Sequence, residues 1–151
     1  MNELHESLTV LCPFDQVPQA AEAYVASLPL ENGKSIVAIR VAVGDLTIER
    51  RADLVLKHSR ASPGFEIMDI QWKPHGGGPY PVFRGFLSVE DMGANFCRLN
   101  LEGSYEPPLG IVGIAFDAVV GHRIALATAR QLLDEIKTGF EFAFQTGMTI
   151  A

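Results

Sequence analysis

Cysteine and positive charge are both scarce in this chain of 151 residues. The only cysteines are Cys12 and Cys97, which lie far apart in separate apolar segments. Two such thiols form neither a disulfide framework nor a zinc site, so the sequence predicts buried, reduced cysteines. The chain has 12 basic and 18 acidic residues, and its formal net charge is −6. Because binding to a nucleic-acid backbone needs a cationic surface, we expect no nucleic-acid partner.

Long uncharged apolar segments are also absent. The most apolar segment, 109–127, is interrupted by Asp117, His122 and Arg123, whereas a membrane-spanning helix needs about 20 nearly uncharged residues. The amino-terminal residues include Glu3 and Glu6, where a secretory signal would have lysine or arginine. The sequence therefore predicts no stable membrane insertion and a cytoplasmic location.

The motifs of common catalytic and cofactor sites are missing. Gly76-Gly77-Gly78 lacks the Lys-Ser/Thr pair of a phosphate-binding loop and fits a hairpin loop better. The sequence has no Gly-x-Ser-x-Gly and no His-Glu-x-x-His motif, and its four histidines are dispersed. We therefore expect neither a metal nor a cofactor.

The chain does have the composition of a globular domain. Apolar residues make up 48% of it and charged residues 20%, which fits neither a disordered segment nor a coiled coil. At about 150 residues, roughly 68–70% of the unfolded surface is buried on folding. The sequence predicts a single domain over residues 1–151 with a substantial core.

Hydrophobic periodicity predicts two helices and a group of strands. Apolar positions spaced three and four residues apart follow Asp15, a candidate N-cap, and predict a short helix that ends at Leu28. A longer amphipathic helix is predicted from Asp117 to Phe140. Alternating apolar and polar residues, separated by short turns that favour antiparallel pairing, predict strands at 7–11, 35–43, 46–58, 65–73, 81–90 and 95–105.

The alternation also predicts which side chains face inward. On strand 46–58, Leu54 and Leu56 are expected to face the core, and Asp53 and Lys57 to face solvent. Polar residues in the middle of the other strands are expected on the outer face, in cross-strand charge pairs that contribute only a few tenths of a kcal/mol. They are Asp69, Arg84 and Arg98.

The later part of the sequence resembles a known family. The residues that carry the resemblance are Leu99-Asn100-Leu101-Glu102-Gly103-Ser104-Tyr105-Glu106-Pro107-Pro108-Leu109-Gly110, followed by Gly113, Asp117 and Arg123. They are similar to the last strand, the Tyr-x-Pro-Pro turn and the long helix of START-like (SRPBCC, polyketide cyclase/dehydrase-type) domains. The resemblance implies an α+β helix-grip fold, in which a curved antiparallel sheet of about six strands wraps around a long C-terminal helix, with a short N-terminal helix.

The resemblance also implies a deep, mainly apolar cavity between the sheet and the long helix. Its ligand would be a hydrophobic small molecule, such as a lipid or a polyketide. Interior Gly85 and Gly103 indicate a bend or a close backbone approach, but the residue types alone fit a filled core equally well. The predicted ligand-binding residues are the inward-facing side chains Leu54, Met68, Ile70, Trp72, Phe83, Leu87, Leu99, Leu101, Tyr105, Ile124, Thr128 and Leu132.

Two other functions stay open on the sequence alone. A cyclase, dehydratase or hydratase would need an acid–base pair that points into the cavity, drawn from His58, Asp69, Tyr105 or His122. His58 shares the predicted inward-facing side of strand 46–58 with Leu54 and Leu56, so it could line the pocket. A position at the end of the strand, exposed to solvent, is the simpler interpretation. A protein-interaction module would instead show a large exposed apolar patch. The sequence indicates no catalytic motif, no particular ligand and no oligomeric state.

Overall fold

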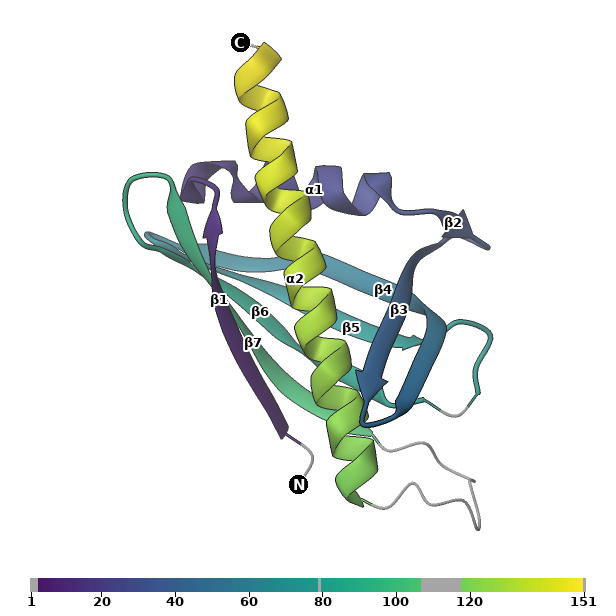
Figure 1. The fold of residues 1–151 in the computed structure, drawn as a ribbon. Coiled ribbons are helices and arrows are strands. Elements are labelled where there is room, and N and C mark those ends of the chain that lie inside the picture. The colour runs from purple at the N-terminus through teal and green to yellow at the C-terminus, as the bar shows by residue number, and fades with distance from the viewer. Residues whose placement is uncertain (1–2, 79, 107–117, 151) are drawn as a thin grey trace.

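One antiparallel sheet curls around a long helix, and a second, shorter helix lies across the top of both (Figure 1). The computed structural model describes residues 3–78, 80–106 and 118–150. The sheet order is β1-β7-β6-β5-β4-β3-β2. The elements in chain order are β1 (Glu3–Leu11), the 3-10 turn η1 (Phe14–Gln16), α1 (Val17–Ser27), β2 (Leu30–Glu31), β3 (Lys34–Val43), β4 (Leu46–Ser62), β5 (Phe65–Pro74), β6 (Val82–Asp91), β7 (Phe96–Glu106) and α2 (Ala118–Ile150).

These elements confirm the predicted helix-grip fold and extend several of its boundaries. The sheet has seven strands because the two-residue β2 pairs with β3. β1 begins four residues earlier than predicted, at Glu3, and β4 continues four residues further, to Ser62. The predicted start of the long helix at Asp117 lies outside the described residues, as does the Pro107-Pro108 turn.

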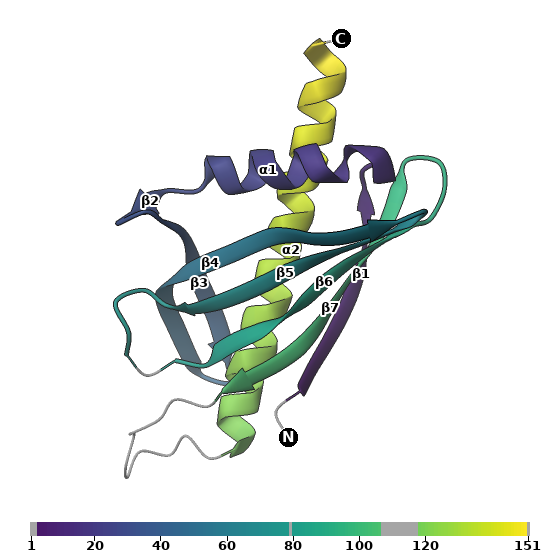
Figure 2. The ribbon, with the colours of Figure 1, turned by 180° about the vertical axis from the view of Figure 1, so that it is seen from behind.

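Helix α2 lies in the concave side of the sheet (Figures 1 and 2). Its backbone comes closest to β1, β3 and α1. Arg130 and Asp134 are exposed on the opposite face, as the amphipathic pattern predicted, and the helix continues beyond Phe140 to Ile150. The face that packs into the sheet consists of Ile124, Ala125, Thr128, Ala129, Leu132, Leu133, Ile136 and Phe140, all buried.

Helix α1 begins differently from the prediction. Asp15 was expected to cap it, but Asp15 lies within η1, and neither η1 nor α1 has a side-chain cap bond. Two prolines instead favour the start of the helix through their backbone conformation. Pro13 holds the entering chain in an extended conformation, and Pro18 sits in the first turn of α1, where its missing N–H needs no partner. The predicted apolar face is confirmed, with Val17 and Tyr24 among its buried residues.

The backbones of β6 and β7 approach closely where Gly85 pairs with Gly103. A Cβ atom on Gly85 would lie 2.1 Å from the carbonyl oxygen of Glu102, and one on Gly103 would lie 2.4 Å from the carbonyl oxygen of Arg84. No side chain fits at either position. The close backbone approach that the two glycines predicted is therefore confirmed.

Strand β4 connects two parts of the sheet, because its first half pairs with β3 and its second half pairs with β5. Its residues 46–54 pair with β3, and its residues 52–62 pair with β5, so only three residues have strand partners on both sides. Beyond Leu54, β4 has β5 as its only strand partner among the described residues. Helix α1 runs alongside this second half of β4 (Figure 2).

The prediction that Asp53 faces solvent is wrong, because the side chain is only 5% exposed. Asp53 does lie on the outer face, but this part of that face is covered. The Nδ1 atom of His75 lies 2.6 Å from Asp53 Oδ1, and Lys34 Nζ lies 3.7 Å from Asp53 Oδ2. His75 also contacts Glu31 through Nε2, at 2.9 Å. Alternation assigns a face of the sheet correctly here but does not reveal the loop that covers it.

Candidate ligand-binding site

A pocket of about 610 Å³ lies between helix α1 and the inner face of β4 and β5; we call it the α1 pocket. The side of α1 that faces these strands carries Pro18, Ala21 and Ala26, whose small side chains do not fill the space beside the sheet. The lining residues are Pro18, Ala21, Glu22, Val25, Ala26, Leu56, His58, Glu66 and Met68.

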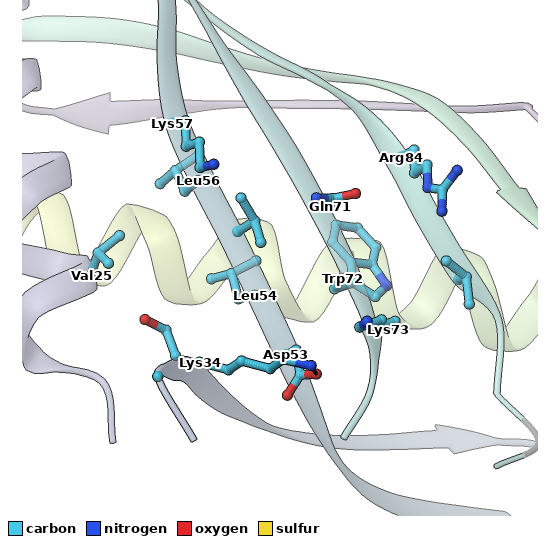
Figure 3. Close-up of a pocket in the computed structure, with 14 residues that line it drawn as sticks. Val25, Lys34, Asp53, Leu54, Leu56, Lys57, Gln71, Trp72, Lys73 and Arg84 are labelled. Carbon is cyan, nitrogen blue, oxygen red and sulfur yellow. Dashed lines mark ion pairs between the residues drawn. The ribbon is translucent and has the colours of Figure 1, made fainter. Parts of the chain in front are cut away.

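A second pocket, of about 540 Å³, lies where β3 separates from β4; we call it the edge pocket (Figure 3). It shares Val25 and Leu56 with the α1 pocket. Because its walls come from both faces of β4 and β5, it combines apolar and charged side chains. The lining residues are Val25, Gly33, Lys34, Ser35, Asp53, Leu54, Val55, Leu56, Lys57, Gln71, Trp72, Lys73, Val82 and Arg84.

The α1 pocket contains a buried carboxylate next to a half-exposed imidazole. His58 Nδ1 and Glu66 Oε1 are 2.8 Å apart, and the side chains are 58% and 3% exposed. His58 lies opposite Met68, so Glu66, two residues before Met68 on the same face of β5, is its diagonal cross-strand neighbour. When the Nδ1–H group donates a hydrogen bond to the carboxylate, the ring is neutral and its Nε2 carries no proton. Nε2 can then accept a hydrogen bond or a proton from a ligand. The pair can therefore orient a polar group of a ligand or take a proton from it.

Glu66 was missed by the sequence reasoning, although a signal was present. It precedes Met68, Ile70 and Trp72 at the same parity, and all four are buried on β5. The alternation therefore placed Glu66 on the inner face. A strand interior that includes a carboxylate is unusual, because a buried charge costs several kcal/mol without a partner.

The twelve predicted ligand-binding residues are all buried, and all of them except Thr128 belong to one hydrophobic core cluster. Leu54 and Trp72 line the edge pocket, and Met68 lines the α1 pocket. Ile70 lines a groove of about 410 Å³ that also contains Asp69. The other eight line none of the pockets described; they are Phe83, Leu87, Leu99, Leu101, Tyr105, Ile124, Thr128 and Leu132. Ligand contact stays a prediction for all twelve.

Two of the predicted polar residues already have partners within the fold. The Thr128 hydroxyl donates to the carbonyl of Ile124 at 2.8 Å and also contacts the hydroxyl of Tyr80. Burial raises the pKa of Tyr80. The Tyr105 hydroxyl lies 3.1 Å from Nδ1 of His122, and burial raises the pKa of Tyr105. These groups connect α2 to the sheet.

The candidates for an acid–base pair are thus distributed over three places. Tyr105 and His122 meet each other, but neither lines the α1 pocket or the edge pocket. Asp69 is exposed on the outer face, as predicted. His58 is the one of the four that lines the α1 pocket, where its partner is Glu66 rather than another of the predicted residues.

Metal binding and membrane crossing have no structural support in the part of the chain that is described. None of its His, Cys, Asp and Glu side chains gather in groups of three or more that could hold a metal ion. None of its helices combines the length and the apolar character that a bilayer crossing requires. Cys12 and Cys97 are free and buried, as predicted, and the Cys97 thiol donates to the Cys12 carbonyl at 3.0 Å.

Comparison with known proteins connects this geometry to a fold. No protein-family model matches the sequence, and no curated protein matches it either. Among solved structures, the Zhui aromatase/cyclase from Streptomyces sp. R1128 aligns with a TM-score of 0.54 at 14% identity, over 95% of this chain and 93% of that one. A conserved protein from Geobacillus kaustophilus aligns with a TM-score of 0.53 at 13% identity, over 97% and 96% of the two chains.

A START superfamily protein from Mycobacterium smegmatis is also similar, with a TM-score of 0.49 at 12% identity, over 97% of this chain and 99% of that one. At these identities the likeness concerns the fold and not the activity. The curled antiparallel sheet, the long C-terminal helix in its concavity and the two stronger alignments show that this chain has the START-like (SRPBCC) helix-grip fold.

Proposed function

We propose that this protein binds a hydrophobic small molecule in the α1 pocket. The observation that carries the proposal is a pocket of about 610 Å³ with mostly apolar walls, in which the buried carboxylate of Glu66 pairs with the half-exposed His58. Small-molecule sites usually measure about 300–1,000 Å³ and combine apolar walls with a few polar groups that fix orientation. The fold is consistent with the same proposal, since one solved structure that shares it is an aromatase/cyclase.

The test uses a substitution that fills the pocket and a matched one that does not. Ala26 lines the α1 pocket and Ala23 does not, although both are exposed residues of α1. We expect wild-type protein and Ala23→Trp to bind the neutral fluorescent probe N-phenyl-1-naphthylamine equally well. Ala26→Trp should weaken binding at least about tenfold, because the indole occupies the probe's space. Equal binding by the two variants, or none by the wild type, would contradict the proposal.

A second candidate function is proton-transfer catalysis of the cyclase, dehydratase or hydratase type. The specific observation in its favour is the His58–Glu66 pair, because a carboxylate that orients a histidine is a common arrangement for a general base. The step would transfer a proton from the carbon next to a carbonyl to Nε2 of His58, and the electron pair of the C–H bond would form an enolate.

Deuterium exchange distinguishes this candidate from simple binding. In D₂O, a hydrophobic ketone such as 2-tetralone should gain deuterium faster with the wild-type protein than with His58→Gln. His122→Gln serves as the control, since His122 lines neither pocket. Exchange at the uncatalysed rate with the wild-type protein would leave binding as the function.

The protein-interaction alternative has less support. A docking surface usually presents a contiguous apolar patch of several hundred Å². Here only three of the exposed large apolar side chains, Phe65, Met92 and Phe96, come from the same end of β5, β6 and β7; the other four, Leu30, Phe86, Val119 and Phe142, lie on β2, β6 and α2.

A further inference from the structure

The polar side chains of the α1 pocket offer negative charge and hydrogen-bond acceptors. Its described lining residues include two carboxylates, Glu22 and Glu66, and the imidazole of His58, but no lysine and no arginine. Ionised carboxylates only accept hydrogen bonds, and an unprotonated Nε2 of His58 also accepts one. A ligand that is complementary to this pocket therefore supplies hydrogen-bond donors.

The two carboxylates come from opposite walls of the pocket. Glu22 lies four residues from both Pro18 and Ala26 on α1, and residues four apart share one face of a helix. Glu66 shares the inner face of β5 with Met68, which also lines the pocket. A molecule between the helix and the sheet thus has a carboxylate on each side.

One oxygen of Glu66 has no partner within the described fold. The Glu66 side chain is only 3% exposed, and its Oε1 contacts His58, whereas its Oε2 makes no hydrogen bond to a described residue. The Tyr24 hydroxyl is the one fully buried side-chain group without a partner in that part of the chain, so Oε2 of Glu66 keeps contact with open space. Glu66 lines the α1 pocket and none of the other four pockets described, so this pocket is the space that Oε2 faces.

The register shift in β4 turns Arg60 away from this site. If strict alternation continued past His58, Arg60 would face the pocket as well. Because of the shift, Arg60 instead pairs with Ile67, which has the outward parity of β5. The residue opposite Glu66 is the neutral Ala61. Among the described residues, Glu66 therefore has no cationic partner other than a protonated His58.

Apolar side chains surround these acceptors, with Val25, Leu56 and Met68 in the same lining. We propose that the ligand of the α1 pocket is a hydrophobic amine, whose ammonium group donates a hydrogen bond to Oε2 of Glu66 and is attracted by Glu22. Such a charge-assisted hydrogen bond is roughly twice as strong as a neutral one. This inference rests on the proposed function, because it identifies the chemical class of the same ligand.

Three ligands with the same alkyl chain test the proposal. Decylammonium, 1-decanol and decanoate differ only in a cationic, neutral or anionic head group, and each is measured by its competition with N-phenyl-1-naphthylamine. We expect decylammonium to bind about tenfold more tightly than 1-decanol, because its ammonium group pairs with the free oxygen of Glu66. Decanoate should bind more weakly than 1-decanol, because Glu22 and Glu66 repel it. Ala26→Trp should weaken all three, since the indole occupies the same space.

A double variant removes the two charges from the pocket without changing side-chain size. Glu22→Gln/Glu66→Gln should reduce the advantage of decylammonium over 1-decanol to less than about twofold and leave the binding of 1-decanol unchanged. The amide oxygen at position 66 can still accept the hydrogen bond from His58, so we expect this variant to fold. Unchanged binding of N-phenyl-1-naphthylamine confirms that the pocket is intact.

The matched control removes the same amount of negative charge elsewhere. Glu90 and Glu106 are exposed and line none of the pockets described, so Glu90→Gln/Glu106→Gln should keep the tenfold preference for decylammonium. If the two double variants lose this preference equally, net charge explains the effect and the proposal is wrong.

The remaining outcomes separate this inference from the proposed function. If the wild-type protein binds N-phenyl-1-naphthylamine and 1-decanol but prefers decanoate, or binds decylammonium no more tightly than 1-decanol, the amine class is wrong and the hydrophobic function stands. If the wild-type protein binds neither the fluorescent probe nor any of the three ligands, both proposals fail.

Discussion

The two helices meet the same sheet in different ways. Helix α2 directs leucine, isoleucine and phenylalanine at the concave face, and Leu132, Ile136 and Phe140 are almost completely buried there. Helix α1 directs Pro18 and Ala21 at β4 and β5, and a pocket lies between them. None of the five pockets described includes a residue of α2. In this molecule, large apolar side chains on α2 fill the space between that helix and the sheet, whereas small side chains on α1 leave a pocket there.

The polar groups differ between the two interfaces as well. At α2, Thr128 and Tyr80 bind each other, so these buried hydroxyls are satisfied within the fold. At α1, Glu66 is buried but lies in the wall of a pocket, with the half-exposed His58 as its partner. A carboxylate in such a place is available to a ligand, whereas the Thr128 hydroxyl is not.

The largest expected difference concerns leucine truncation on the two sides. Leu132→Ala should destabilise the protein by about 2–5 kcal/mol, because it opens a cavity in a filled interface. Leu56→Ala should cost only about 1 kcal/mol, because Leu56 is partly buried and already borders open space. Urea unfolding measures both free energies. Equal losses at the two sites would show that the α1 side is as tightly packed as the α2 side.

The next effect concerns the stability of the sheet where β6 and β7 approach closely. Gly103→Ala should destabilise the protein by about 3 kcal/mol, since the new Cβ would meet the Arg84 carbonyl and the Phe83 ring. Gly121→Ala is the matched control, because a Cβ there meets nothing within 4 Å on α2. The control should be neutral or stabilising by up to about 1 kcal/mol. A mild effect of Gly103→Ala would mean that the sheet can flatten at little cost.

A smaller effect is expected where the two helices cross. The Tyr24 hydroxyl is buried and has no hydrogen-bond partner among the described residues, and its burial, together with Glu135, raises its pKa. Tyr24→Phe should stabilise the protein by up to about 1 kcal/mol. Tyr80→Phe, which removes a contact with Thr128, should destabilise it by a similar amount. Thermal unfolding would reveal the opposite signs, and loss of stability in Tyr24→Phe would point to a partner for that hydroxyl.

The last effect depends on pH and concerns the two thiols. Burial raises the pKa of Cys12 from 9.0 to about 11 and that of Cys97 from 9.0 to about 12. Because the folded state favours the neutral thiols, their contribution to stability is complete below pH 9 and is lost as the pH rises towards 11–12.

Alkylation and unfolding measurements test the prediction for the thiols. Iodoacetamide should modify the native protein much more slowly than the urea-unfolded chain at pH 8.5, because the folded state suppresses the reactive thiolate. The double variant Cys12→Ala/Cys97→Ala should lose less stability than the wild type between pH 8 and pH 10. Rapid alkylation of the native protein would show that the part of the core around Cys12 and Cys97 opens readily.

Much of the fold was predictable because it depends on local patterns. The alternation in strands 65–73 and 95–105 identified the buried faces that contain Met68 and Leu99, and the helical periodicity of 117–140 identified the face of α2. These patterns persist because a one-residue slip would expose a whole face to water. The close pairing of Gly85 and Gly103 was also foreseen, since only glycine tolerates such an approach.

The candidate site was only partly predictable because it depends on how distant segments pack. The residue types of α1 indicated a helix, but the pocket exists because α1 lies along the half of β4 that β3 leaves uncovered. The pairing of His58 with Glu66 depends on the register between β4 and β5, in which His58 lies opposite Met68, and alternation within one strand does not give that register. Asp53 was misassigned because its cover comes from His75 in a separate loop.

The short overlap in β4 has a consequence for the motion of the sheet. Only Ala52, Asp53 and Leu54 are paired to both β3 and β5, so the β2–β3 hairpin joins the rest of the sheet through a three-residue hinge. Amide hydrogen exchange should therefore divide the sheet into two opening units, with β3 protected independently of β5, β6 and β7. Val37, Ile39 and Val41 of β3 belong to the core, and Gln131 of α2 bonds to the backbone of Ala38 and Arg40, so separation of β3 from the sheet would also open its side of the core.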